Sequence, residues 1–398
     1  MTIEQIYSEL NNVVKGITGF TTVTVADHKG FVSLGNDILN SNSGVELFGK
    51  SLGDRIAKIL SEVDSYIARN RMLWTDNITY GSALKIVHFK DTFNSKNDMY
   101  GDTIHVNPSD KGSISEPVTN TYSRVGVWDY SELVIFRNQL EKAFISESEM
   151  ASFLDSQFTC VYNARELDKE STDNIAINTM IAQKLYNATS KPMGAINLIK
   201  LYNDETGLTI SPAQALRDKE FLRFSSMKIS QIGKQLNDKT ILFNNLEGVS
   251  SHTPTDRKVV EVLTDFANAC KYYLEADTYN ADIVSLGDYN ELNYIQGYGN
   301  TGSFTERSTI NINLLTDTAA GTTTPVEQSG IVGIIRDKRL VRTMYDKVYA
   351  DTYYNPATRG TTYFFHAEKG YMIDNAYNGV IFYLKEIAWL ILNYVGAL

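Results

Sequence analysis

One stretch of the chain has the spacing of a phosphate-binding loop. Residues 44–51 read GVELFGKS and match the pattern G-x-x-x-x-G-K-S, in which Lys50 would reach a nucleotide phosphate and Ser51 a magnesium ion. Such a loop follows a hydrophobic strand, and its inner residues are small so that backbone N–H groups can surround the phosphates. Here the polar segment ILNSNS precedes it, and the inner residues VELF are bulky or acidic. We therefore interpret the match as fortuitous and expect a helix to begin here.

The histidines and cysteines do not form a reactive group. The histidines are scattered along the chain, without a pair spaced i, i+4, and they are His28, His88, His105, His252 and His366. His88 and His105 could meet across a hairpin, but two ligands without a third make a weak metal site. Cys160 and Cys270 fit neither a disulfide nor a zinc spacing. We expect both to be buried small side chains in a protein made in a reducing compartment.

No catalytic, cofactor-binding or metal-binding residue can be assigned from the sequence. There is no G-x-S-x-G motif, and the chain has too many carboxylates for a catalytic pair to be singled out. The sequence therefore predicts no enzyme and no cofactor. The 24 tyrosines, together with abundant Asn and Thr, favour extended polar contact surfaces, as at subunit or sugar interfaces.

Length and charge restrict the class of protein. A chain of 398 residues with 43% hydrophobic and 21% charged residues can form two or three domains with ordinary cores. Its formal net charge of -10 argues against sequence-specific nucleic-acid binding, which needs clustered Lys and Arg. Residues 1–16 are expected to form a capped helix rather than a signal peptide. Near the C-terminus, Lys385 and Glu386 interrupt the apolar run, so we expect a strand and a buried helix, not a membrane span.

Hydrophobic periodicity predicts a mixture of helices and strands, an α+β fold with a sheet split in sequence. Strands are expected at 20–27, 258–263 and 331–337, with two or three more within 341–384. Helices are expected within 45–70, after Ser211-Pro212, and from 264 onward, and loops dominate 277–330. Residues 78–127 contain short strand-like pieces with few apolar side chains, so this segment must pack on another surface, including that of another chain.

Residues 146–184 have the pattern of one very long helix. A capping box formed by Ser146 and Glu149 opens it, and at 1.5 Å per residue it would be about 58 Å long. Its middle, Arg165 to Asp173, is polar nearly all round. The alternative is two helices with a break near Ser171.

A tight turn near the C-terminus stands between two runs rich in Thr and aromatic residues. Residues 354–370 read YNPATRGTTYFFHAEKG, and the Asn-Pro and Arg-Gly pairs predict a hairpin turn that contains Arg359.

The order of these elements and four segments resemble one family. The segments are IVGIIRDKRLVRTMYD (331–346), the hairpin at 354–370, DNAYNGVIF (374–382) and the long-helix segment 146–171. They are similar to the major capsid proteins of tailed bacteriophages, which have the Hong Kong 97 fold, and above all to those of picovirus-type short-tailed phages. The resemblance implies six parts: an N-terminal arm (1–75), an extended loop (76–126), a peripheral domain with the spine helix (127–198), an axial domain (199–329), peripheral-domain strands (330–384) and a tail (385–398). Some relatives carry a C-terminal immunoglobulin-like domain, whereas this chain ends in EIAWLILNYVGAL.

The resemblance also implies a function. The chain would be a structural subunit that self-assembles into an icosahedral shell around double-stranded phage DNA, without sequence specificity and without a membrane. Its partners would be copies of itself and a portal, with a scaffolding protein as a further candidate, and it would be found in the virion after assembly in the host cytoplasm. The turn at Arg359 would point to a junction of three subunits. Alternatives are an encapsulin-like shell protein, or a sugar-binding protein or enzyme that uses the Tyr- and Asn-rich segment.

Overall fold

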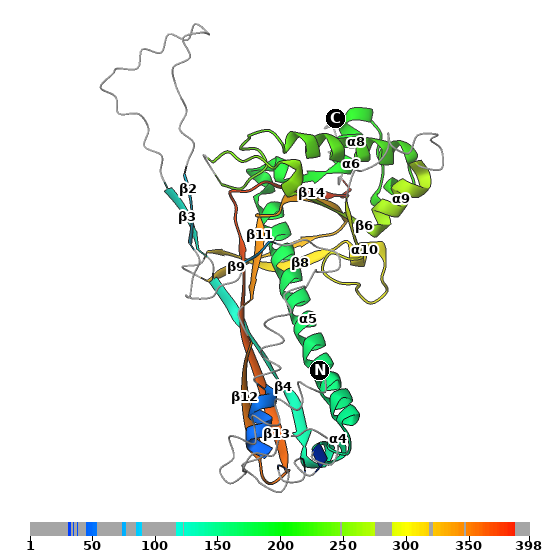
Figure 1. The fold of residues 1–398 in the computed structure, drawn as a ribbon. Coiled ribbons are helices and arrows are strands. Elements are labelled where there is room, and N and C mark those ends of the chain that lie inside the picture. Colours follow the sequence, from blue (N-terminus) through cyan, green and yellow to red (C-terminus); the bar gives the residue numbers. More distant parts are fainter. Residues whose placement is uncertain are drawn as a thin grey trace, which may run out of the picture.

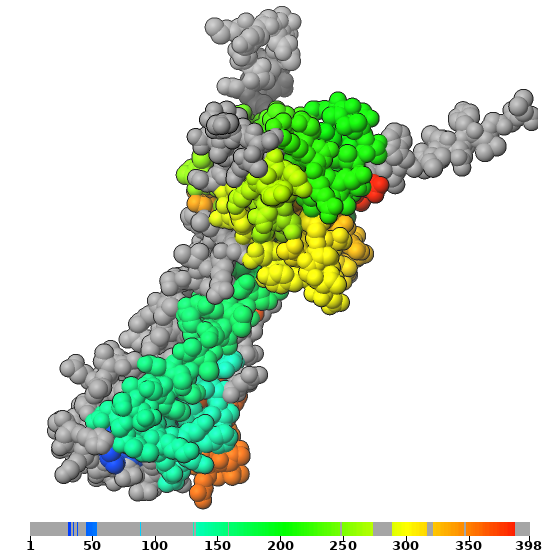
Figure 2. All heavy atoms as spheres, turned by 90° about the vertical axis from the view of Figure 1, so that its right-hand side faces the viewer, coloured from blue at the N-terminus to red at the C-terminus, as the bar shows by residue number. Residues whose placement is uncertain are grey.

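The computed structural model describes residues 31–32, 35, 38, 45–53, 74–76, 85–89, 117–121, 123–246, 249–274, 289–317, 321–345 and 348–386. Figure 1 shows an elongated molecule with a head, which contains the helices α6, α8 and α9, and a long stem, which contains the strands β4, β12 and β13 with the helix α5 beside them. Figure 2 shows the same two parts from the side. The expected helix at 1–16 and strand at 20–27 lie outside the described residues.

Helix α5 (Glu147–Tyr186) is the long element that joins head and stem. Its 40 residues form one continuous helix, so the prediction of a single helix is confirmed and a break near Ser171 is excluded. The Ser146 side chain accepts a hydrogen bond from the Glu149 backbone N–H and thereby satisfies one of the free donors at the helix start. The short helix α4 (Arg137–Ala143) precedes α5 at the far end of the stem.

The stem is built on a five-stranded sheet whose centre is β13 (Gly360–Ile373). One side of β13 pairs with β4 (Ser123–Phe136). Its other side pairs with β12 (Tyr349–Asn355) and, further along, with β11 (Val341–Tyr345). Strand β11 also pairs with β1 (Trp74–Asp76). Alternate residues of β4 and β13 point toward α5 and form one core cluster with it: Leu133, Ile135, Tyr363, Phe365, Met150, Leu154 and Val161. The stem therefore has its own core.

The head contains a second five-stranded sheet, in the order β5 (Ala195–Asn197), β14 (Gly379–Tyr383), β10 (Ile331–Asp337), β6 (Lys258–Leu263) and β7 (Asn290–Leu292). Every residue of β10 is buried, as its continuous apolar sequence predicts. Val332 and Ile335 pack with α6 (Leu198–Thr206), α8 (Lys219–Gln235) and α9 (Thr264–Leu274). Ile331 and Ile334 point the other way, toward the C-terminal part of α5. Helices thus cover both faces of this sheet.

A buried ion pair joins two strands of the head sheet. The Glu261 carboxylate accepts hydrogen bonds from Nε and Nη2 of Arg336 at 3.2 and 3.0 Å, and both side chains are fully buried. Strands β6 and β10 come from opposite sides of the expected boundary at 329/330, so residues 199–329 and 330–384 contribute to the same sheet.

Smaller elements complete the described chain. Two antiparallel hairpins are formed by β2 (Lys85–Phe89) with β3 (Pro117–Thr121), and by β8 (Ile310–Asp317) with β9 (Thr322–Gln328). Short helices are α7 (Pro212–Ala215), capped by Ser211 as expected, α10 (Phe304–Arg307), and the 3-10 turns Asn187–Thr189, Pro192–Gly194 and Thr255–Arg257.

Two expectations need correction. The segment 341–384 forms four strands, β11 to β14, rather than two or three, because β13 is long enough to pair with both β11 and β12. The Thr-rich segment 316–325, expected as loop, lies mostly in β8 and β9, because β-branched Thr residues favour strands and pairing between the two strands tolerates Pro325.

Candidate assembly surfaces

The turn between β12 and β13 is exposed and held in one conformation. Residues 356–359 are all exposed at the far end of the stem (Figure 1). The Ala357 N–H donates to the side-chain oxygen of Asn355 at 3.0 Å, and the Arg137 N–H donates to the carbonyl of Arg359 at 2.9 Å. Pro356 fixes one further backbone angle. The turn is therefore a stiff projection anchored to the start of α4.

Arg359 combines an unusual backbone with an available charge. Its φ of 52° makes it the only non-glycine residue with positive φ among those described. Within the described part of the chain, its guanidinium makes no ion pair or side-chain hydrogen bond. The sequence therefore predicted this hairpin correctly, and the structure places a fork-shaped guanidinium group at its exposed tip.

One face of the stem sheet carries exposed aromatic side chains next to this turn. Tyr349 and Tyr353 of β12 are 58% and 60% exposed, and Phe136 at the end of β4 is 41% exposed. On β13, the rings of Phe364 and His366 stack on the same face. Such rings, apolar in body and polar at the hydroxyl, are typical of protein contact surfaces.

The β2–β3 hairpin is tied to the head through one histidine. His88 Nε2 lies 2.7 Å from a carboxylate oxygen of Asp374, which is fully buried, and the His88 ring meets the Tyr377 ring edge-on. In the strand register His88 lies opposite Val118. His105, which could have met His88 across the hairpin, lies outside the described residues. The contact between His88 and Asp374 holds the hairpin near the end of its ladder formed by Phe89 and Pro117.

One face of the polar middle of α5 packs against the sheet. Asp168 pairs with Lys369 of β13. The Tyr345 hydroxyl donates to Asp173 at 2.7 Å, and the Lys169 carbonyl lies 3.1 Å away as an alternative acceptor for the same hydrogen. Burial, with the nearby Asp173 charge, raises the pKa of Tyr345 well above its usual value, so the hydroxyl stays a donor.

Sequence reasoning missed this contact. Arg165, Lys169 and Asp173 recur at every fourth position, which places them on one face of the helix, but this spacing does not show that the face is buried. On other faces, Leu167 and Ile175 are 68% and 50% exposed.

The phosphate-loop match is part of a helix. Residues 45–53 are helical, and Val45, Phe48 and Leu52 are buried against the stem core. A Cβ at Gly49 would come within 3.1 Å of Thr361, so this glycine permits close packing on β13. The expected helix start is confirmed.

The remaining candidates for chemistry stay apart. In the part of the chain that the structure describes, no group of three or more His, Cys, Asp or Glu side chains could hold a metal ion. His252 and His366 lie in different parts of the molecule, and His28 is not among the described residues. Cys270 is buried as expected, but Cys160 is exposed. The latter prediction was wrong because position 160 lies on the outer face of α5, beside the buried Val161. No helix among the described residues has the length and apolar character needed to cross a membrane.

Comparisons with known proteins point to one family. A model of the Phi29-like phage major capsid protein family matches residues 10–383. No curated protein matches. Among solved structures, one match is a chain from the structure of the head fiber and inner core protein gp22 of native bacteriophage P68. It has a TM-score of 0.50 and 11% sequence identity, and the match covers 81% of this chain and 88% of that chain. A chain from the capsid structure of Staphylococcus phage Andhra matches with a TM-score of 0.49 and 9% identity, over 81% of this chain and 88% of that chain. A chain from the capsid structure of the Cyanophage P-SCSP1u matches with a TM-score of 0.43 and 12% identity, over 82% of this chain and 91% of that chain.

Proposed function

The chain belongs to the Phi29-like phage major capsid protein family and is a subunit of a phage capsid shell, and from this we propose which of its surfaces join the copies. The expected α+β fold of the Hong Kong 97 type is confirmed. Copies of the chain assemble with one another, and the protein is a component of the virion. A shell needs self-complementary surfaces repeated by symmetry.

We assign the turn at 356–359 to a junction of three subunits. The support is its exposed position at the end of the stem, its stiffness and the available guanidinium of Arg359. Around a threefold axis, three arginines would repel one another unless each bound a carboxylate of the next copy. A bidentate contact between guanidinium and carboxylate meets that need.

The hairpin β2–β3 and the chain it carries form the extended loop, 76–126, which packs on a neighbouring copy. The support is the small number of apolar side chains in its sequence, which predicts that the segment must pack on another surface. The outward face of α5, with Leu167 and Ile175 exposed, offers a surface on which such a loop can bury apolar area.

The same reasoning divides the chain into an arm (1–75), the extended loop (76–126), peripheral segments (127–198 and 330–384), an axial segment (199–329) and a tail (385–398). In this scheme the stem, with α5 and β13, is the peripheral domain, and the head contains the axial one. Strands β10 and β14 of the segment 330–384 complete the head sheet, so the two domains share strands.

Further partners follow from the shell role. We propose that the subunit meets a portal at one vertex and a scaffolding protein during assembly in the host cytoplasm, and that it encloses double-stranded DNA without base recognition. A net charge of -10 suits a wall that must not bind the genome tightly. The family is a structural one, and we propose that the chain catalyses no reaction.

The proposed function is tested by microscopy of the purified protein. Negative staining should show closed shells, rings or tubes built from many copies. Small discrete oligomers of a few copies at every concentration and salt condition would contradict a shell subunit.

A further inference from the structure

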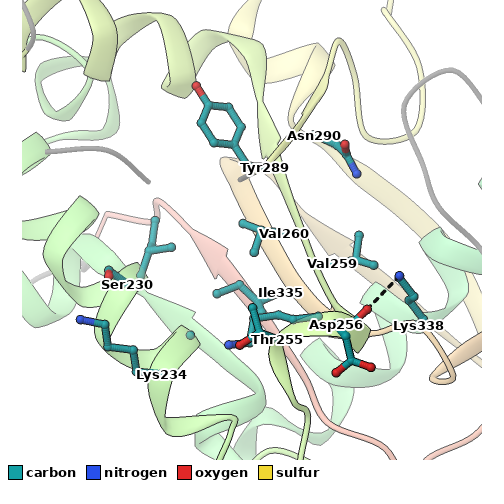
Figure 3. Close-up of a pocket in the computed structure, with 13 residues that line it drawn as sticks. Ser230, Lys234, Thr255, Asp256, Val259, Val260, Tyr289, Asn290, Ile335 and Lys338 are labelled. Atoms are coloured by element: carbon teal, nitrogen blue, oxygen red, sulfur yellow. Dashed lines mark hydrogen bonds between the residues drawn. The ribbon is translucent and has the colours of Figure 1, made fainter. Parts of the chain in front are cut away.

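A pocket with a cationic rim opens on the head, between the C-terminal part of α8 and the edge of the sheet formed by β6 and β7. Its volume is about 520 Å³, enough for several side chains. Figure 3 shows Ser230 and Lys234 of α8 on one side, Tyr289 and Asn290 on the opposite side, and Val260 and Ile335 between them. The floor is therefore apolar and the rim polar.

Three lysines belong to this rim, and none of them has a carboxylate partner among the described residues. Lys258 Nζ donates to the Asn237 side-chain oxygen at 2.9 Å, and Lys338 Nζ donates to the Asp256 carbonyl at 2.9 Å. Lys234 is exposed on α8. By contrast, Lys228 and Lys271, elsewhere on the head, pair with Glu205 and Glu291 at 2.6 Å.

The charge around the pocket is unlike that of the whole chain. Among its lining residues, Asp256 is the one acid beside three lysines, whereas the chain has 47 acidic and 37 basic residues. The surface of any neighbouring copy is on average acidic. Charge complementarity of this kind steers and orients protein contacts.

We propose that this pocket binds a segment of a neighbouring copy of the same chain that carries a carboxylate beside an apolar side chain. The apolar group fills the floor at Ile229, Val260 and Ile335, and the carboxylate lies between the rim lysines. This inference rests on the proposed shell function, because it needs a second copy held against the head. A heterologous contact of this kind, pocket to segment, closes into rings when repeated around an axis.

A nucleic-acid occupant fits the pocket less well. A phosphodiester chain is polar along its whole length and would leave the aliphatic floor exposed to water. An acidic peptide segment satisfies floor and rim together, since each ammonium gains a charge-assisted hydrogen bond and the floor loses solvent contact.

The test uses full-length protein and two kinds of substitution. Lys234→Glu reverses a charge at an exposed helix position, and Ser230→Trp fills the pocket without changing its charge. Lys200→Glu, an exposed change on α6 outside the pocket, is the matched control. We expect both pocket variants to fold and unfold like the wild type and to lower shell yield about tenfold, while the control assembles normally. In wild-type shells, a carbodiimide should also cross-link Lys234 or Lys258 to a carboxylate of a second copy.

Other outcomes overturn the inference. Normal shell yield from both pocket variants would remove the pocket from the subunit interface. Normal shells that package less DNA would assign the pocket to nucleic acid instead. Absence of particles from the wild type itself would refute the proposed function and the inference with it, whereas wild-type shells with unaffected variants refute the inference alone.

Discussion

At the scale of single residues, Arg359 is notable because its backbone has a conformation that glycine adopts more readily than any residue with a Cβ. Its φ of 52° lies in the left-handed region, which costs a residue with a Cβ roughly 1–2 kcal/mol. Nothing in the described part of the subunit compensates through its guanidinium. The strained backbone and the exposed charge together motivate our proposal that Arg359 contacts a neighbouring subunit.

Substitution of Arg359 separates folding from assembly. Arg359→Glu should give soluble, folded subunits with unchanged thermal unfolding but a severe loss of shells, because like charges would then meet at every three-subunit junction. Truncating one partner of a desolvated interfacial pair typically costs about 2–5 kcal/mol.

Arg359→Gly should relieve the strained backbone and fold at least as well, yet assemble poorly. Circular dichroism melts measure the folding of each variant, and sedimentation of assembly reactions measures its shell formation. Wild-type yields from Arg359→Glu would remove this turn from the junction.

Lys184 makes the stability of the subunit depend on pH. Its ammonium is buried and donates to the Phe243 carbonyl at 2.7 Å, and burial lowers its pKa from 10.5 to about 7. Between these values the unfolded chain binds a proton that the folded chain does not. The free energy of unfolding should therefore rise with pH, by at most about 1.4 kcal/mol per unit, from pH 7 to 9. Below pH 7 both states are protonated and the dependence ends.

Denaturant unfolding of unassembled subunits at pH 7, 8 and 9 measures this effect. Lys184→Met, which keeps the length of the side chain without the charge, should be more stable than the wild type at pH 7, and the difference should shrink as pH rises. The exposed Lys200→Met is the control and should leave the slope unchanged. A constant difference across this range would contradict the argument.

At the scale of elements, the sequence predicted where a helix forms better than it predicted which face of that helix is buried. The cap at Ser146 and the apolar stripe were enough to place α5, because both are local signals. The burial of Lys169 and Asp173 could not be read from the same stretch, because it depends on Tyr345, which lies far away in the sequence. Local patterns predict an element, but its partner decides which face is inside.

The extended loop can be shortened to test its role. Deletion of residues 90–111 leaves 112–116 to join β2 to β3, so the hairpin and the His88–Asp374 contact should be kept. We expect a soluble, folded subunit that fails to form shells, because in our proposal the loop packs on a neighbouring copy.

The readouts for this deletion are the melting temperature, hydrogen exchange of the β2–β3 amides, and electron microscopy. Unfolded protein, or normal shells, would show that the loop has a different role.

At the scale of the whole molecule, the family resemblance predicted the architecture, but the order of the strands within each sheet could not be predicted from the sequence. The head sheet joins β5, β14, β10, β6 and β7, so strands far apart in sequence lie side by side. The Glu261–Arg336 pair and the lysine pocket arise only from that pairing. No spacing in the sequence brings Lys234, Lys258 and Lys338 together, and so no reading of the sequence alone predicted the pocket.

The unbroken helix α5 also has a mechanical consequence. It runs from the head core to the end of the stem, and its 40 residues make a rod about 60 Å long at 1.5 Å per residue. A rod of that length is a lever: a tilt of about 5° where it enters the head displaces its far end by about 5 Å. We therefore expect neighbouring subunits in flat and in strongly bent regions of a shell to differ by a few degrees where this helix enters the head, so that a small change at one end of the molecule would set the curvature at the other.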